Sequence, residues 1–227
     1  MKFSKVLLVA ACGIFALSAG AYEYTFSGDK NVMDSFRFGK WMPKAKMAQE
    51  TSFQNADGRV MLAVGKENPA WYPNENETFR DGIAAFKFQM INNCNVILRV
   101  RDNYNSGNDY YAFQFQPSQN RVNFLKRYRN KTYDIGKAAF TPSADKKYEL
   151  QAICKGNSFS LKVNGKVIGT WTDENSPLLA GLCSFGTNWG TKVFLDSFSY
   201  KNCDVTITAP AAEKPAPAPV VKLEKKK

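Results

Sequence analysis

The sequence predicts an all-β domain built as an antiparallel two-sheet sandwich. Aromatic residues make up 14% of the 227-residue chain, including 17 Phe and 10 Tyr, and strands favour such side chains. From Lys147 to Tyr200, apolar and polar residues alternate with a period of two, and no segment there has the period of a helix. Asn164-Gly165 separates two of these alternating runs, which is the strongest local signal for a two-residue hairpin.

Residues 1–21 have the pattern of a secretory signal peptide. Lys2 and Lys5 precede an apolar run, and Ala19-Gly20-Ala21 offers a small-residue cleavage site. The run is shorter than the ~20 residues that a membrane span needs, so we expect no transmembrane segment in the mature chain. We expect an exported protein, periplasmic or extracellular, that starts at Tyr22. The alternative is a lipoprotein that starts at Cys12, after Val9-Ala10-Ala11.

Residues 22–208 are expected to form one domain, long enough to bury a sizeable core. Strands are predicted at 22–26, 36–41, 58–64, 83–90, 95–102, 110–116, 121–129, 147–155, 158–163, 166–173, 178–185 and 192–200, with 36–41 pairing 58–64. In the hairpin, Leu161 is expected to face Ile168 and Phe159 to face Thr170, with Trp171 on the opposite face. Trp41 is expected to be a core residue.

Three segments carry a resemblance to a known fold. They are LKVNGKVIGTWTD at 161–173, AGLCSFG at 180–186 and VFLDSFSY at 193–200. Together they resemble the C-terminal half of a concanavalin A-like lectin/glucanase jelly roll, nearest to laminin-G-like modules and the 3-keto-disaccharide hydrolase domain family. The resemblance implies a carbohydrate-binding domain. The alternatives are a hydrolase acting on a 3-keto-disaccharide or another glycan, and a structural envelope protein that binds another protein.

Composition limits the chemistry that the chain can perform. It contains no histidine, which excludes Ser-His-Asp and Cys-His nucleophiles and histidine metal sites. A glycosidase needs only two carboxylates, but the Glu-x-Asp-x-x-Glu spacing of many jelly-roll glucanases is absent. The whole chain carries a net charge of +11, of which the predicted signal peptide contributes +2 and the tail +3, so the folded part keeps +6. This moderate charge is compatible with an anionic glycan, and no nucleic-acid-binding signature accompanies it.

One sheet face is the strongest candidate for a binding site. Alternation in 95–102 and 110–116 places five polar or aromatic side chains away from the core: Arg99, Arg101, Tyr110, Gln114 and Gln116. Planar donors beside an aromatic ring suit sugar hydroxyls. The resemblance adds Asp102, because its Arg-x-x-Asp…Tyr-Tyr pattern matches Arg99, Asp102 and Tyr110-Tyr111. The alternative is an ordinary solvated face whose arginines cover apolar area.

Three further aromatic residues lie in turn-rich segments: Trp71, Tyr72 and Trp189. Exposed loop aromatics commonly stack on sugars, so we predict that they assist binding. The alternative is that each one fills an end of the sandwich.

Cysteines and acids suggest further sites. Cys94, Cys154, Cys183 and Cys203 are predicted to form two disulfides, with buried free thiols as the alternative. The resemblance places a structural calcium near Asp196, with Asp29 contributing, although hydrogen bonding to the backbone is the preferred role for Asp196. No other cofactor is expected.

Residues 209–227 are rich in Pro, Ala and Lys and are predicted to be disordered. This tail either tethers the protein to an anionic envelope polymer or is simply solvated.

Overall fold

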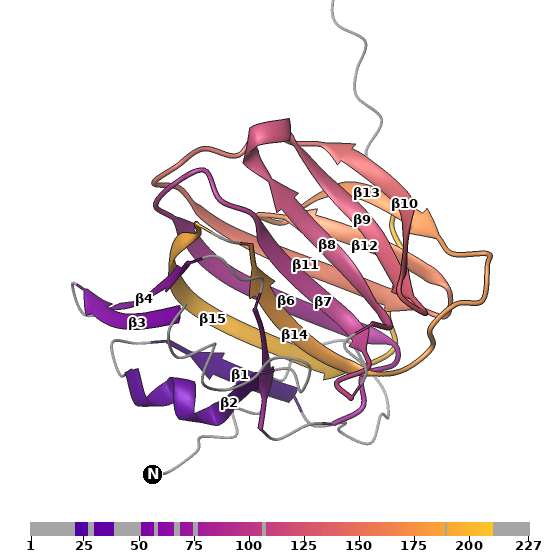
Figure 1. The fold of residues 1–227 in the computed structure, drawn as a ribbon. Helices are drawn as coiled ribbons and strands as arrows, with labels where there is room; N and C mark the ends of the chain where they lie inside the picture. Colours follow the sequence, from indigo (N-terminus) through magenta and orange to yellow (C-terminus); the bar gives the residue numbers. More distant parts are fainter. Residues whose placement is uncertain are drawn as a thin grey trace, which may run out of the picture.

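The computed structural model describes residues 21–26, 30–38, 51–56, 59–65, 69–74, 77–105, 108–188 and 190–210. It consists of two antiparallel sheets stacked face to face (Figure 1), which confirms the predicted fold class. Most of the predicted signal peptide and tail, together with Trp41, Asp29 and Trp189, lie outside the described residues. Within the described part of the chain, none of the helices has the length and apolarity to cross a bilayer.

Sheet A has the strand order β13-β12-β11-β6-β15-β4-β3, and β1 pairs with one end of β15. Its strands are β1 (Ala21–Thr25), β3 (Thr51–Ala56), β4 (Arg59–Val64), β6 (Gly82–Met90), β11 (Lys147–Lys155), β12 (Ser158–Val163), β13 (Lys166–Thr172) and β15 (Lys192–Asn202). The long strand β15 is central: it pairs with β6 on one side and with β4 and β1 in succession on the other.

Sheet B has the strand order β10-β9-β8-β7-β14-β5-β2. Its strands are β2 (Phe36–Phe38), β5 (Ala70–Pro73), β7 (Val96–Asp102), β8 (Tyr110–Gln116), β9 (Arg121–Tyr128), β10 (Lys131–Ala139) and β14 (Leu182–Thr187). Two short 3₁₀ helices, Lys30–Ser35 and Pro117–Gln119, complete the described elements.

The core between the sheets is built from aromatic rings. Phe86 of sheet A stacks on Phe185 of sheet B with ring centroids 4.7 Å apart, and Phe88 meets Phe115 edge-on at 5.8 Å. Because strand side chains alternate between faces, every second residue of β8, and of β7 as far as Val100 and β9 as far as Phe124, enters this core, and the residues between them point outward. The predicted inward set of β8, which includes Phe115, is confirmed.

The predicted hairpin forms, but part of its register is wrong. Asn164 and Gly165 have φ values of 48° and 81°, as a two-residue turn requires, and Val163 pairs with Lys166. A bulge then shifts the register, so Leu161 pairs with Gly169 and Phe159 with Trp171. Trp171 therefore lies on the core side, where its ring is 5.3 Å from that of Phe124.

Other predictions fail where the sequence signal is weak. The segments 36–41 and 58–64 do not pair: β2 belongs to sheet B and β4 to sheet A. Strands β3, β5 and β10 were not predicted. In β10 a register shift between Asp134 and Gly136 interrupts the alternation that would have revealed it.

Candidate functional site

The candidate site is the solvent side of β7, β8 and β9 in sheet B. The sheet B outer face is defined here by the outward side chains of these strands: Ile97, Arg99, Tyr110, Ala112, Gln114, Gln116, Arg121, Asn123, Leu125 and Arg127. Strand pairing sets Tyr110 beside Arg127, Gln114 beside Asn123 and Gln116 beside Arg121. Ala112 lies between Arg99 and Leu125 in the middle of this surface.

At one end of the face, Arg99 and Tyr110 form a fixed pair. The guanidinium carbon of Arg99 lies 4.3 Å from the centroid of the Tyr110 ring, and Arg99 is only 5% exposed. The Nη1 atom of Arg99 is 3.7 Å from Oδ2 of Asp102. The predicted trio of Arg99, Asp102 and Tyr110 is therefore brought together, with Tyr110 as its partly exposed member.

Asp102 is buried beneath the sheet B outer face and holds Arg99, Tyr72 and Ser184 in position. Its Oδ2 accepts hydrogen bonds from the hydroxyls of Tyr72, at 2.6 Å, and Ser184, at 3.2 Å. Burial raises the pKa of Asp102 above its ordinary value, even though Arg99, Tyr72 and Ser184 favour the ionised form. Burial, followed by the charge of Asp102, also raises the pKa of Tyr72 well above its ordinary value. Both groups are buried, so they can orient Arg99 but present no surface to a ligand.

The other end of the face is a row of amides. Asn123 Nδ2 donates to Gln116 Oε1 at 2.7 Å, and Gln116 Nε2 donates to Gln114 Oε1 at 3.2 Å. Asn123 is 6% exposed, and its Oδ1 has no hydrogen-bond partner within the described part of the protein. Arg121 ends the row beside Gln116. The row can both donate to and accept from a hydroxyl-rich ligand.

Arg101 does not join this face, which corrects the sequence prediction. Its φ of 52° breaks the alternation of β7, and its side chain turns into the end of the sandwich, where it is 1% exposed. There it donates to the backbone oxygens of Arg80, Gly156 and Leu178 and pairs with Asp81 at 3.0 Å. Arg101 is therefore a structural tie between loops.

Trp71 and Tyr72 are not exposed loop residues. They lie on β5, where Trp71 is 1% exposed and stacks on Phe185 with centroids 5.5 Å apart, and Tyr72 holds Asp102. Trp189, the third predicted loop aromatic, lies outside the described residues.

Asp196 is engaged by cations on the outer side of sheet A. Its Oδ1 lies 2.6 Å from Arg59 Nη2, and its Oδ2 lies 3.8 Å from Lys147 Nζ. A register shift in β15 between Leu195 and Ser197 separates Asp196 from the face that Phe198 occupies. The described residues hold no group of three acidic or cysteine ligands, and the calcium site at Asp196 and Asp29 stays a prediction.

The four cysteines are free thiols, so the predicted disulfides are not confirmed. Cys94 contacts the backbone of Lys192, where β15 begins, whereas Cys203 follows the last residue of β15. Eleven residues of strand separate the two by roughly 30 Å, far beyond the ~7 Å Cα separation that a disulfide spans. Cys154 and Cys183 lie in the apolar core, and burial raises the pKa of both.

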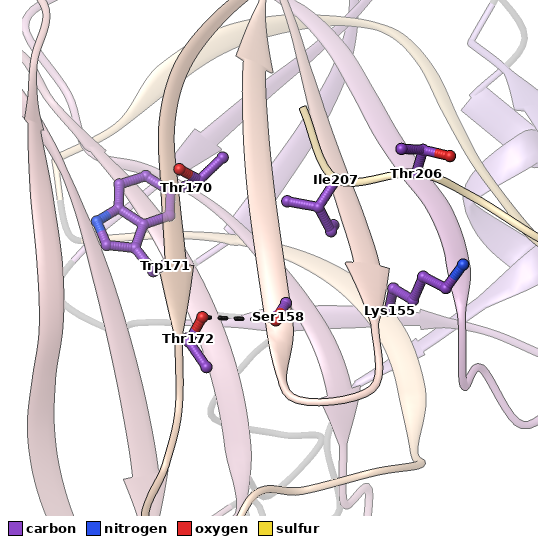
Figure 2. A pocket seen from close by; sticks show the side chains of 7 residues that line it. All are labelled: Lys155, Ser158, Thr170, Trp171, Thr172, Thr206 and Ile207. Carbon is purple, nitrogen blue, oxygen red and sulfur yellow. Dashed lines mark hydrogen bonds between the residues drawn. The ribbon is translucent and has the colours of Figure 1, made fainter. Parts of the chain in front are cut away.

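A separate hollow of about 420 Å³ lies on the outer side of sheet A (Figure 2). Strands β11, β12 and β13 line it together with the segment after β15: Lys155, Ser158, Thr170, Trp171, Thr172, Thr206 and Ile207. In Figure 2 the ring of Trp171 points away from Ser158, Lys155 and Ile207, toward the interior contacts described above. The hollow thus offers hydroxyls, while the one ring at its border, that of Trp171, is turned away from them.

Three residues of the face were missed from the sequence: Arg121, Asn123 and Arg127. The signal was present, since Val122 and Phe124 enter the core and alternation then places these three outward. The predicted ligand surface includes only the segments that form β7 and β8. That β9 lies next to β8, and so extends this surface, follows from the order of the strands in the sheet, which local sequence patterns do not reveal.

The order and facing of the two sheets define a concanavalin A-like jelly roll. Solved structures with this architecture superpose on most of the chain. No protein-family model matches the chain, and no curated protein matches its sequence.

Three solved structures illustrate the likeness. A Bacillus subtilis protein of unknown function with a galectin-like fold gives a TM-score of 0.61 at 15% identity, over 82% of this chain and 97% of that one. Bacillus licheniformis β-glucanase gives 0.58 at 10% identity, over 82% and 100%. The carbohydrate-binding module CBM66 of Bacillus subtilis gives 0.56 at 11% identity, over 74% and 92%. At these identities the likeness establishes the fold alone.

Proposed function

We propose that this protein is a carbohydrate-binding domain and that the sheet B outer face is its ligand surface. The observation that carries the proposal is the juxtaposition of Tyr110, held by Arg99, with the amide row of Gln114, Gln116 and Asn123. An aromatic ring beside planar donors and acceptors matches the alternating apolar and hydroxyl surfaces of a sugar. Two neighbours of the same fold, a β-glucanase and a carbohydrate-binding module, are consistent with it.

Binding is favoured over hydrolysis by the state of the acids near this face. A glycosidase needs two carboxylates that flank the scissile bond. Asp102 is 0% exposed and held by Tyr72 and Ser184, Asp134 pairs with Lys137 at 2.5 Å, and Asp109 accepts a hydrogen bond from the backbone N–H of Arg129. Each of these acids is thus engaged by another group of the protein. Turnover of a 3-keto-disaccharide that one carboxylate substitution abolishes would establish the hydrolase alternative.

A glycan array probed with the full-length protein tests the proposal. We expect binding to at least one saccharide class, and Gln114→Ala should weaken it about tenfold by leaving sugar hydroxyls unpaired, at roughly 1–2 kcal/mol. Thr172→Ala, in the hollow on sheet A, is the control and should leave binding unchanged. Absence of binding to every glycan, or a loss with Thr172→Ala alone, would contradict the proposal.

We also propose that the protein acts outside the cytoplasm, on the basis of its N-terminal signal pattern. Intact-mass spectrometry of exported material should give a chain starting at Tyr22. A lipidated chain starting at Cys12 would support the lipoprotein alternative instead. Export would place the domain and its basic tail among envelope or extracellular polysaccharides.

A further inference from the structure

Two arginines of β9 point outward on sheet B without an acidic partner in the part of the chain that the structure describes. Among the described residues, four basic groups of sheet A meet acids: Arg59 and Lys147 meet Asp196, Lys87 meets Glu149, and Lys155 meets Asp204. Other lysines of sheet A, such as Lys162, have no ion pair there, so the distinguishing feature of the β9 arginines is the buried Nε–H of each. On the sheet B outer face, Arg121 and Arg127 have no carboxylate within 4 Å in the described part of the chain. Each is half-buried, and the Nε–H of each is buried without an acceptor there.

The acidic residues near Arg121 and Arg127 form ion pairs or hydrogen bonds with other groups. Asp134 is paired with Lys137, Asp102 with Arg99, Tyr72 and Ser184, and Asp109 accepts from the backbone N–H of Arg129. The outer face therefore carries an uncompensated positive charge at two places. An unsatisfied buried donor costs free energy, so an anionic acceptor brought by a ligand would be favoured at each place.

The spacing of the two arginines sets the size of that ligand. Arg121 and Arg127 are six residues apart on one strand, hence on one face and about 20 Å apart at ~3.3 Å per residue. Arg127 is beside Tyr110 at one end, and Arg121 is beside Gln116 at the other, with Gln114 and Asn123 between them. A single sugar cannot reach both arginines, whereas an oligosaccharide lying along β9 can.

We propose that the sheet B outer face is selective for an acidic polysaccharide, in which the carboxylates of two separated uronic-acid units engage Arg121 and Arg127. The inference rests on the proposed function, because it names the class of saccharide that this face takes. The planar guanidinium binds a carboxylate through two parallel N–H donors, and after a small side-chain rotation the Nε–H of each arginine would be one of them. The amide row then meets the hydroxyls of the intervening sugars.

The test compares one polymer with and without its charge. The full-length protein is titrated with polygalacturonate and with the same polymer after methyl esterification of its carboxylates, at low and at high ionic strength. We expect the free acid to bind at least about tenfold more tightly, with affinity falling as salt rises. Arg121→Gln and Arg127→Gln should each weaken binding roughly tenfold, the loss of a charged hydrogen bond.

Two controls separate recognition from general attraction. Lys162→Gln removes the same charge from the outer side of sheet A and should leave affinity for polygalacturonate unchanged. Arg127→Lys keeps the charge but loses the planar fork, so it should bind more weakly than the unaltered protein. Equal losses in Lys162→Gln and Arg127→Gln, or equal binding of dextran sulfate and polygalacturonate, would show non-specific charge attraction and overturn the inference.

The failure of this inference differs from failure of the proposed function. Tight binding of the esterified polymer, sensitive to Gln114→Ala but not to Arg121→Gln or Arg127→Gln, would overturn the selectivity while leaving a carbohydrate-binding face. Binding to no saccharide at all would overturn both.

Discussion

Replacement of Lys126 by methionine tests how the open end of the sandwich is held together. Lys126 is a residue of β9 and is 3% exposed. Its ammonium group reaches three acceptors beyond the strand. It donates to Asp173 Oδ2 at 2.7 Å and to the backbone oxygens of Asn175 and Ser176 in the segment that leads to β14. The same carboxylate oxygen accepts from the Tyr111 hydroxyl at 2.5 Å. The cluster thus joins β8 and β9 to the segment that crosses between the sheets.

The expected loss is large because the carboxylate would stay buried. Asp173 is 2% exposed, and Lys126→Met leaves it with only neutral donors, Tyr111 and the backbone N–H of Asn175. Breaking a buried ion pair by removing one partner lowers the free energy of unfolding by about 3–5 kcal/mol. Lys162→Met, on the outer side of sheet A, is the control and should cost less than about 0.5 kcal/mol.

The pH dependence of the lost stability shows whether the unpaired charge of Asp173 causes the loss. Burial alone would raise the pKa of Asp173, but hydrogen bonds from Lys126 and Tyr111 outweigh it and hold the pKa below its ordinary value. A depressed pKa in the folded state gives stability that is present above the unfolded pKa of about 3.9 and lost as pH falls through the folded pKa. In Lys126→Met the carboxyl can protonate at little cost, so the difference from the unaltered protein should be greatest at neutral pH and shrink in acid.

Urea denaturation followed by tryptophan fluorescence, at neutral pH and at several acidic values, measures both effects. A loss below about 1 kcal/mol at neutral pH would refute the reasoning, since the burial of the pair would then carry no penalty. A difference that stays constant into acid would show that the lost stability comes from packing and not from the Asp173 charge.

Three further predictions follow from the core. Trp71→Ala should lower the free energy of unfolding by about 3–5 kcal/mol as a core truncation. An unchanged denaturation midpoint would contradict the position of the Trp71 ring in the core, stacked on the ring of Phe185. Gly136→Ala should cost about 1–3 kcal/mol and change the fluorescence of Trp171, because the added Cβ would lie 2.1 Å from that ring; a neutral effect would contradict the close approach. Burial raises the pKa of Cys94 to about 11 and of Cys154 to about 12, while unfolded thiols ionise near 8.5, so the unfolded chain holds fewer protons in alkali. Stability should therefore fall by about 1–2 kcal/mol per thiol between roughly pH 8.5 and 10, and Cys154→Ala should reduce that slope by one proton; identical slopes would contradict it.

The alternation of apolar and polar residues predicted much of the architecture. Tyr110–Gln116 is a strand with the predicted bounds, and its inward and outward sides are as the period of two requires. The same rule failed at Arg101, because a residue with φ of 52° turns its side chain out of the strand's alternation. The sequence contains no signal for a left-handed conformation at this non-glycine residue, so alternation alone predicts that Arg101 lies on the same face as Arg99.

Long-range pairing explains the other differences. The prolines and acids around Trp71-Tyr72 predicted a loop, but the pair lies on a short strand between β14 and β2 that sends Trp71 into the core and Tyr72 to Asp102. Its partners are more than thirty residues away in one direction and more than a hundred in the other, so no local pattern shows them. The missed arginines of β9 share this cause, because their place beside Tyr110 and Gln116 depends on which strands neighbour β8.

An NMR titration with an acidic oligosaccharide tests the central claim most directly. The side-chain Nε–H signals of Arg121 and Arg127, assigned by their loss in the two Arg→Gln variants, are followed in the full-length protein as hexagalacturonate is added. The account predicts that both signals shift together with backbone amides of β8 and β9, because the ligand lies along the sheet B outer face. Shifts confined to the hollow lined by Ser158, Thr172 and Thr206, or no shift on β8 and β9 when binding is saturated, would contradict it.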